Sequence, residues 1–287
     1  MDFPVGVQDI DDINMDADGS PAETDSLWSV STWILPFMEQ NNAFDVLGAR
    51  SSNTLSSQLR NNPQSSGSSP TLIILETFPA GLCPSDSGGD INSVRTGLGL
   101  NDMGTAKTNY VYANNALRNP FEAANDNEDG WINPGGPNNN TNPTGIFSDR
   151  EQGLGSMRDG STNVIILSER NTSGTGTNAN GEQIQANPGA GLLYGVRGDV
   201  FASSQSGRDV DTDAGGFQDI AFASRGRINS QDPVEAPHGV SSNHNGGVNV
   251  VLGDASTHFM NDSTNQVTLN QLINIRDGNV VDDHIAN

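Results

Sequence analysis

The sequence predicts an α+β fold in which a short N-terminal helical region packs on an antiparallel β-sheet. Apolar residues alternate along Val248–Leu252, a turn follows, and Thr257–Met260 returns as a second strand, which is the pattern of a β-hairpin. The continuous apolar run inside Asn163–Ser168 is typical of a strand that is buried on both faces. Hydrophobic residues make up only 33% of the chain and glycines number 33, so long irregular loops must connect these elements.

The first elements follow an acidic N-terminal segment, residues 1–25. From Trp28 to Thr32, apolar or β-branched residues alternate with serines, as they would along a strand. Pro36 then suits the first turn of a helix, because a residue at that position needs no backbone N–H. The apolar side chains of this predicted helix are Phe37, Met38, Phe44 and Leu47.

The middle of the chain alternates short apolar segments with polar insertions. Thr71–Phe78 is a buried segment, either a strand or a short helix, and another short strand lies within residues 192–202. Residues 119–143 and 171–190 are rich in polar and turn-forming residues that cannot supply an apolar face, so we expect loop insertions there. No internal repeat divides the chain, and residues 1–287 are expected to form a single domain.

The charge of the chain limits its partners. Its 13 Lys and Arg residues oppose 35 Asp and Glu residues, and the net charge of −22 repels phosphate backbones and anionic membrane surfaces. We therefore expect no nucleic-acid partner, whereas divalent cations suit an excess of carboxylate oxygens. The chain has no run of about 18 apolar residues, the length that a membrane span requires. Its first residues lack the basic and apolar regions of a signal peptide.

Two acidic segments are candidates for binding Ca²⁺, the one cofactor that the sequence suggests. In the first, oxygen-bearing side chains stand at positions one, three, five and twelve of a loop with glycine at position six, which is the calcium-loop pattern; these side chains are Asn14, Asp16, Asp18 and Asp25. The second repeats the alternate spacing without a distant ligand, and consists of Asp209, Asp211 and Asp213. A solvated acidic turn is the alternative interpretation of both segments.

The sequence offers little that would support catalysis. It has no nucleophile elbow, no phosphate-binding glycine loop followed by lysine and no zinc-protease helix motif. Cys83 has no base near it in the sequence, which favours a buried structural thiol. His244 and His258 would hold a transition metal if the hairpin brought them together, although exposed hairpin histidines are the commoner case. We therefore expect a protein that is not an enzyme.

Several stretches, in the same order along the chain, resemble a family of prepilin-like proteins of unknown function that is expanded in planctomycete bacteria. The strongest is a histidine followed after nine residues by an aspartate, with GGVNV between them; these two residues are His244 and Asp254. The other stretches are WILPFMEQ at 33–40, CPSD at 83–86, Asn109-Tyr110, DGSTNVIILSER at 159–170 and NIRDGNVV at 274–281. In the family, the aspartate that ends the histidine–aspartate signature is followed by glycine. This chain has Ala255 after Asp254, so we expect the turn to avoid positive φ.

The resemblance implies a pilin-like head that lacks the N-terminal leader and long apolar helix of full-length members. It also implies a structural subunit, pilin-like or pseudopilin-like, that is extracellular or on the cell surface and assembles with copies of itself into a filament or surface structure. Within it, His244 and Asp254 are expected to have structural roles at the two ends of one strand. Asp254 would accept hydrogen bonds from turn N–H groups, and His244 would fix the bend at Gly246-Gly247.

A second hypothesis is a calcium-stabilised module that binds carbohydrate. Aromatic rings in loops stack against sugars, and Trp131 in EDGWINPGG offers both a ring face and neighbouring polar groups. Three asparagines also stand in triplets that glycosylating cells modify: Asn139, Asn171 and Asn261.

Overall fold

The computed structural model describes the chain in segments. These are residues 26–47, 77–92, 105–115, 145–147, 152–172, 227–231, 239–279 and 281, together with short strands at 2–3, 7–8, 175–177, 183–185, 190–191, 194–196 and 221–223.

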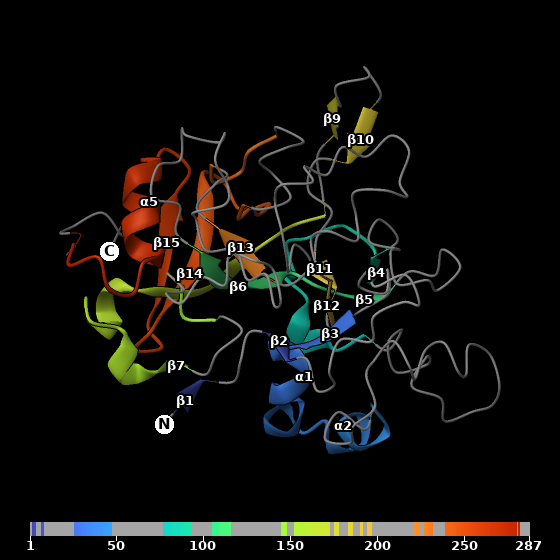
Figure 1. The fold of residues 1–287 in the computed structure, drawn as a ribbon. Coiled ribbons are helices and arrows are strands. Elements are labelled where there is room, and N and C mark those ends of the chain that lie inside the picture. The colour runs from blue at the N-terminus through green and yellow to red at the C-terminus, as the bar shows by residue number, and fades with distance from the viewer. Residues whose placement is uncertain are drawn as a thin grey trace, which may run out of the picture.

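The centre of the structure is a five-stranded sheet, and it confirms the predicted α+β class. Its order is β13-β6-β8-β14-β15, with the strands at Ala221–Ala223, Tyr110–Asn115, Ile165–Glu169, Gly247–Leu252 and Thr257–Asn261. β13 pairs with β6 in parallel, and every other pair in the sheet is antiparallel. The buried apolar run therefore became a central strand, β8, between β6 and β14 (Figure 1).

The predicted hairpin is present as β14 and β15, with Val250 opposite His258 and Val248 opposite Met260. Its turn corrects one prediction, because Ala255 has a φ of +67°. The Ala255 N–H donates to Leu252 O at 2.9 Å, and the Leu252 N–H donates to Ser256 O at 2.9 Å. A three-residue hairpin loop of this kind ends in a left-handed residue. The loop geometry therefore imposes the positive φ even where the side chain is not glycine.

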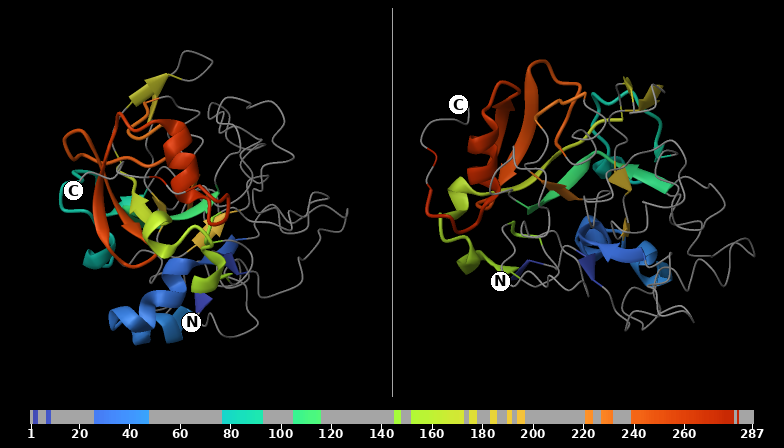
Figure 2. Two further views of the ribbon diagram at one scale, coloured as in Figure 1. Left: turned by 90° about the vertical axis from the view of Figure 1, so that its left-hand side faces the viewer. Right: turned by 45° about the horizontal axis from the view of Figure 1, so that its top comes forward.

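Each face of the sheet is covered by its own apolar cluster, because alternate strand residues point to opposite faces. Val111 and Ala113 of β6 face one cluster, which also includes buried residues of a C-terminal helix, α5 (Gln266–Ile273). Tyr112 faces the other cluster together with Val30, which begins the first N-terminal helix. Figures 1 and 2 show α5, in red, and the blue N-terminal helices on opposite sides of the sheet.

The N-terminal helical region is predicted correctly in position but not in detail. Strand β3 covers Ser26–Ser29, and helix α1 already begins at Val30 and runs to Ile34, so the strand predicted across residues 28–32 is wrong from Val30 onward. A five-residue alternation is too short to exclude a helical turn, and burial of Val30 and Ser31 under the sheet decides for the helix. Pro36 stands in the first turn of a 3₁₀ helix as expected; the two elements that follow α1 are η1 (Leu35–Met38) and α2 (Asn41–Leu47).

Short strands form four smaller sheets around this centre. They are β11-β5-β4 (Ala190–Gly191, Thr105–Thr108, Ile91–Asn92), β12-β3-β2 (Tyr194–Val196, Ser26–Ser29, Val7–Gln8), β1-β7 (Asp2–Phe3, Gln152–Gly153) and β10-β9 (Gln183–Gln185, Thr175–Thr177). Three single 3₁₀ turns complete the described elements: η2 (Pro79–Gly81), η4 (Leu154–Ser156) and η5 (Ser161–Asn163). The insertion at 171–190 therefore contains an antiparallel pair, β9 with β10, whereas the insertion at 119–143 lies outside the described residues.

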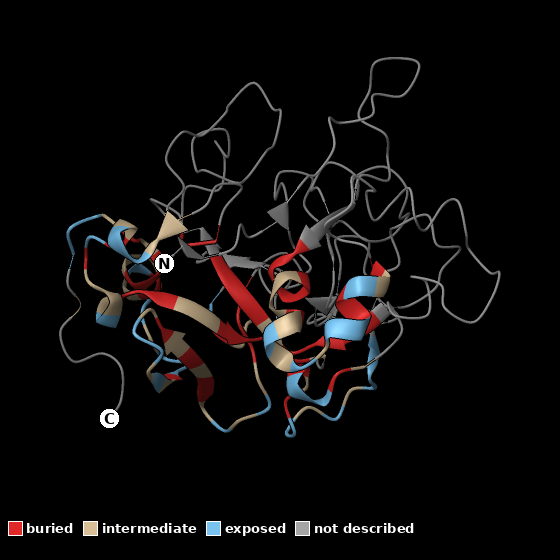
Figure 3. Cartoon of the chain, turned by 90° about the horizontal axis from the view of Figure 1, so that it is seen from below, coloured by how far each residue is buried: buried red, intermediate tan, exposed pale blue. Residues whose placement is uncertain are grey.

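Burial is concentrated in the middle of the large sheet and under the helices (Figure 3). None of the helices in the described segments has the length and apolar character needed to cross a lipid bilayer. At the end of β8, burial includes charged and polar side chains as well, namely Lys107, Asn109, Glu169, Arg170 and Asn171. This buried polar region is the candidate site.

Candidate functional site

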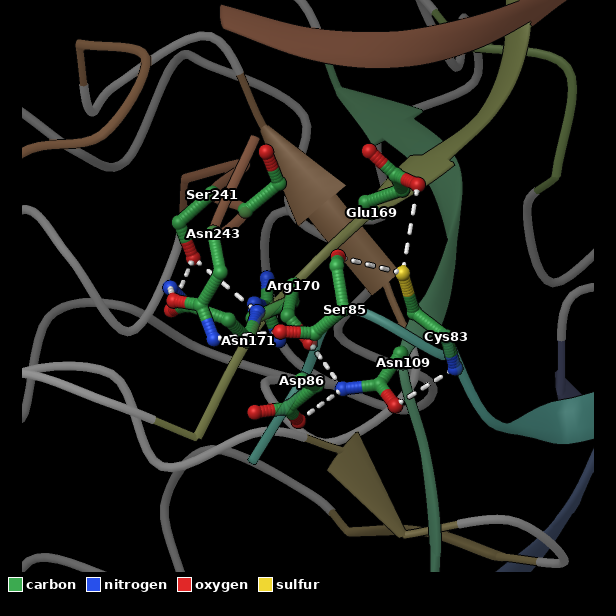
Figure 4. A pocket seen from close by; sticks show the side chains of 10 residues that line it. Cys83, Ser85, Asp86, Asn109, Glu169, Arg170, Asn171, Ser241 and Asn243 are labelled. Carbon is green, nitrogen blue, oxygen red and sulfur yellow. Dashed lines mark hydrogen bonds between the residues drawn. The ribbon is translucent and has the colours of Figure 1, made fainter. Parts of the chain in front are cut away.

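The candidate site lies where four separate segments meet beside the large sheet. Cys83 follows the η2 turn, Asn109 joins β5 to β6, Glu169 ends β8, and His244 belongs to the loop that leads into β14. Figure 4 shows the Cys83 sulfur directed toward Ser85 and Glu169, with Asn109 on the other side of the cysteine. The segments bring together residues that are far apart in the sequence, since Cys83 and His244 are separated by 161 positions.

Three ligand-type side chains converge on one point. The Cys83 sulfur lies 3.7 Å from His244 Nε2 and 3.8 Å from Glu169 Oε1, and Nε2 lies 3.2 Å from the same Oε1. Ser85 Oγ is 3.0 Å from the sulfur and 3.5 Å from Nε2. Cys83 and Glu169 are buried, whereas the His244 side chain is 32% exposed, so the group is open to solvent on the imidazole side only. We call Cys83, Glu169 and His244 the thiol–carboxylate–imidazole cluster.

The carboxylate and the imidazole are both fixed in place from β14. The Asn249 backbone N–H donates to Glu169 Oε2 at 2.8 Å, and the Asn249 side-chain amide donates to Oε1 at 3.2 Å. The His244 backbone N–H donates to Ser242 Oγ at 3.0 Å, and that hydroxyl donates to Gly247 O at 2.6 Å. Glycine is required at 247, because a Cβ there would lie 2.0 Å from Met260 O. This close approach holds the histidine loop against the sheet.

Hydrogen bonds link the three members through Glu169 Oε1, which accepts from the Cys83 thiol at 3.8 Å and lies 3.2 Å from His244 Nε2. A neutral imidazole nitrogen is either a donor or an acceptor. Nε2 can therefore donate to Glu169 or accept from the Cys83 thiol, but it cannot do both. The contacts also differ from a catalytic triad, in which the carboxylate and the nucleophile use opposite ring nitrogens. The arrangement resembles a set of ligands around a common centre more than a relay.

A buried ion pair adjoins the cluster. Lys107 Nζ lies 2.9 Å from Asp86 Oδ2, and both side chains are only 2% exposed. Lys107 Nζ also donates to Gly88 O at 3.1 Å, and the Thr172 hydroxyl donates to Asp86 Oδ2 at 2.9 Å. Both charges are paired with each other and accept or donate further hydrogen bonds. This is the condition under which a protein tolerates buried charges.

Asn109 connects this ion pair to the cysteine. Its Oδ1 accepts the Cys83 backbone N–H at 2.9 Å, while its amide group donates to Asp86 Oδ2 and, at 2.9 Å, to Arg170 O. A single amide thus uses both its donor and its acceptor groups to join three segments. This explains why asparagine occupies a position that is 1% exposed.

The electrostatics differ between the Asp86–Lys107 pair and the thiol–carboxylate–imidazole cluster. Burial acts to raise the pKa of Asp86, but hydrogen bonds from Lys107, Asn109, the Gly88 N–H and Thr172 outweigh it, so the pKa is lowered. On the cysteine side, burial raises the pKa of Tyr110, and the charges of Cys83 and Glu169 raise it further. The negative charge that acts on Tyr110 belongs to the cluster's own Cys83 and Glu169, whereas Asp86 is paired with Lys107.

The remaining buried groups close the site. Arg170 is fully buried and donates from Nε and Nη2 to Gly239 O at 3.1 and 3.0 Å. Asn171 donates to Asn243 Oδ1 at 2.7 Å, and Asn243 donates to Ser85 O at 3.0 Å. The depression lined by these residues does not admit a water molecule. A single ion would need no cavity beyond the centre of its ligands.

The structure supports part of the sequence interpretation of the His and Asp signature and corrects the rest. Asp254 does accept hydrogen bonds in the turn, from the Ser256 N–H at 2.9 Å and the Ser256 hydroxyl at 2.6 Å, and these bonds lower its pKa. The His244 ring reaches the cysteine and the glutamate, whereas the bond to Gly247 O comes from the Ser242 hydroxyl. Cys83 is buried as expected, but it has a base beside it in space although none is near in sequence.

The other described candidates do not join the cluster. His258 is bound to the Ser256 hydroxyl at 2.9 Å on the hairpin and does not approach His244 as a ligand partner. Asn171 is buried and hydrogen-bonded inside the site, so a glycan could not be attached to it in the folded protein. Asn261 is exposed at the end of β15, where its Oδ1 accepts from the Ser263 N–H at 2.8 Å.

Several predicted site residues lie outside the described residues, and their assignments remain sequence-based. They are the calcium candidates Asn14, Asp16, Asp18, Asp25, Asp209, Asp211 and Asp213, the possible sugar contact Trp131, and Asn139.

Sequence reasoning missed Glu169, Asn109 and Lys107 as members of a site. Each belongs to or adjoins a stretch that was noticed only for its resemblance: Glu169 ends DGSTNVIILSER, and Asn109 begins the Asn-Tyr pair. The signal that would have found them is that the CPSD, Asn-Tyr, Ser-Glu-Arg and histidine stretches all carry polar residues at the ends of apolar segments. In an antiparallel sheet the start of one strand lies beside the end of its neighbour, so the start of β6, the end of β8 and the start of β14 come together.

Comparison with known proteins gives the family but no function. No curated protein and no solved structure matches the chain. One family model, described as a protein of unknown function (DUF1559), matches residues 1–267. Since the match spans most of the 287 residues, the chain belongs to the DUF1559 family.

Proposed function

We propose that the chain is the head of a pilin-like or pseudopilin-like subunit that assembles with copies of itself outside the cell. The order of motif stretches that resembles prepilin-like proteins supports this class. The α+β arrangement, with N-terminal helices against one face of a mainly antiparallel sheet, fits such a head. A long acidic chain with a net charge of −22 also fits a surface protein better than a nucleic-acid or membrane-surface binder.

The observation that carries the proposal is that residues of the motif stretches contact one another and join segments of the chain. Cys83, Asn109, Glu169 and His244 come from four of these stretches, and they bond to one another at the junction of four segments. The depression that they line has no space for a water molecule. Motif residues with this arrangement hold a domain together, which is what a structural subunit requires.

A candidate assembly contact lies on the N-terminal helical region. Phe37 is 87% exposed although its neighbours in η1 are partly or fully buried. Its backbone is restricted on both sides, because Pro36 stands in the first turn of η1 and Glu39, with a φ of +62°, follows the last residue of η1. In the same helical region, the centroids of the Trp33 and Phe44 rings lie 6.1 Å apart in an edge contact. An exposed aromatic ring on a restricted backbone is the kind of residue that anchors a protein interface.

Sedimentation velocity over a concentration series, followed by electron microscopy, tests the proposal on the full chain. We expect wild type to form oligomers or filaments, and Phe37→Ser to weaken association by roughly tenfold or more. Val267→Ser is the matched control, since it removes a different exposed apolar side chain, 47% exposed on α5. Wild type that stays monomeric at every concentration would contradict the proposed function, and equal loss in both variants would contradict the assigned contact.

A further inference from the structure

The thiol–carboxylate–imidazole cluster has the dimensions of a metal site. In a tetrahedral zinc site with a Zn–S bond of about 2.3 Å and Zn–N and Zn–O bonds of about 2.0 Å, the ligand atoms lie about 3.3 to 3.6 Å from one another. The corresponding separations here are 3.7 Å for sulfur to nitrogen, 3.8 Å for sulfur to oxygen and 3.2 Å for nitrogen to oxygen. All three are within a few tenths of an ångström of the tetrahedral values.

We propose that Cys83, Glu169 and His244 bind a single divalent transition-metal ion of the zinc class. Cys83 Sγ, Glu169 Oε1 and His244 Nε2 are the ligand atoms, and their convergence is the observation on which the assignment stands. On binding, the Cys83 S–H bond breaks, the proton passes to solvent, and a sulfur–metal bond forms. The fourth corner lies on the side of Ser85, whose Oγ is near both sulfur and nitrogen.

The ligand types select this metal class. Thiolate and imidazole are preferred by zinc and its neighbours, whereas calcium requires oxygen ligands only. The site is thus chemically distinct from the acidic segments that the sequence suggested for Ca²⁺.

The groups around the cluster are those that a metal site needs. Asn249 holds Glu169 through both carboxylate oxygens, as outer-shell partners of ligating carboxylates do. Exposed Ser85 and the partly exposed His244 ring leave a route by which an ion reaches the buried sulfur. A metal ion accepts electron pairs from sulfur, nitrogen and oxygen at the same time, so all three side chains can bind it together.

Cobalt substitution gives a sharp test, because Cys83 is the only cysteine in the chain. The 287-residue chain is stripped with a chelator and titrated with Co²⁺ alone while its absorption spectrum is recorded. We expect one equivalent to produce a sulfur-to-cobalt charge-transfer band together with intense tetrahedral d–d bands. Zn²⁺ added afterwards should abolish both. Any thiolate band must come from Cys83, so its appearance identifies the ligand directly.

Variants separate the ligands from their surroundings. Cys83→Ser should lose the charge-transfer band, and His244→Gln should lose tight binding. Asn249→Ala should weaken Zn²⁺ binding by about tenfold to a hundredfold, since an outer-shell partner is removed. His258→Gln is the matched control, because this second histidine lies on the neighbouring strand and bonds to Ser256, so it should titrate as wild type does.

A second readout covers the possibility that Cys83→Ser fails to fold. In wild type, Zn²⁺ should slow alkylation of the Cys83 thiol by about tenfold or more, since a bound thiolate is a poorer nucleophile than a free one. A titration without a charge-transfer band, or alkylation that is equally fast with and without Zn²⁺, would overturn the proposal. The test is independent of assembly, because Phe37→Ser should bind Co²⁺ like wild type.

Discussion

Ala255 is the residue whose backbone conformation disagrees most clearly with its side chain. It adopts a φ of +67° at the end of the hairpin loop, a region that costs an alanine about 1–2 kcal/mol relative to right-handed conformations. We expect Ala255→Gly to raise the free energy of unfolding by about 1 kcal/mol, because glycine adopts positive φ without the Cβ clash. Urea denaturation of the two proteins measures the difference.

A glycine placed two residues later provides the comparison for this prediction. Thr257 begins β15 and does not have a positive φ, so Thr257→Gly should lose stability through greater chain entropy in the unfolded state. If both glycine variants are destabilised, the left-handed strain at 255 is not the controlling factor.

The Asp86–Lys107 pair makes stability depend on pH in a defined direction. Because the folded-state pKa of Asp86 is lowered, its ionised form stabilises the fold above the unfolded-state value of about 3.9, and this stabilisation is lost as the pH falls through the lower folded value. Asp86→Asn leaves Lys107 buried without its partner, which should cost about 3–5 kcal/mol near neutral pH. The gap between variant and wild type should narrow below pH of about 4, as wild-type Asp86 itself becomes protonated.

Urea unfolding at a series of pH values measures the difference in free energy of unfolding between wild type and Asp86→Asn. The double variant Asp86→Asn with Lys107→Met removes both charges and should recover part of the loss, since no unpaired ammonium is left buried. If this free-energy difference stayed constant over the whole pH range, the ionised carboxylate of Asp86 would not be the source of the stabilisation.

At the scale of single residues, the sequence limits what can be predicted about the site. Cys83 and Glu169 are 86 positions apart and Glu169 and His244 are 75 apart, so no local spacing reveals that they meet. Asp254, whose partner Ser256 is two positions away, could be interpreted correctly from sequence. The difference is physical, because turn hydrogen bonds are local whereas the cluster depends on which strands pair.

At the scale of elements, period and length decide which predictions succeed. The β14–β15 hairpin shows a period of two over a long enough stretch, and its buried face includes Val248, Val250 and Leu252. Helix α5 has only eight residues, Gln266–Ile273, and was not predicted. Such a short helix is marginal alone and forms because Leu269, Leu272 and Ile273 pack on the sheet. The strand and helix at Ser26–Ile34 show the same competition, resolved by tertiary burial.

The N-terminus of α5 yields a prediction at this scale. Asn265 caps the helix, with its Oδ1 accepting the Val267 N–H at 2.8 Å. Asn265→Ala should lower the free energy of unfolding by about 1 kcal/mol, while Asn265→Ser, which keeps a capping oxygen, should lose much less. Thermal unfolding followed by circular dichroism measures both. Equal losses would show that the cap contributes nothing beyond the packing of α5 on β6 and β8.

At the scale of the whole molecule, the net charge of −22 opposes the assembly that we propose. Copies with the same sign repel one another, and this repulsion extends over the Debye length, about 30 Å at 0.01 M salt but about 8 Å at 0.15 M. Self-association must therefore be driven by short-range contacts such as the one assigned to Phe37, and it becomes effective only where the long-range field is screened.

Association should consequently strengthen as NaCl is raised from about 0.01 to 0.15 M, since the Debye length shortens across that range. Sedimentation velocity at fixed protein concentration measures this, with sucrose replacing salt as a control that leaves the charge unscreened. Phe37→Ser should remain weakly associated at every salt concentration, because screening removes repulsion but supplies no contact. If association instead weakens with added salt, charge pairs rather than apolar surface hold the copies together, and the contact assigned to Phe37 is wrong.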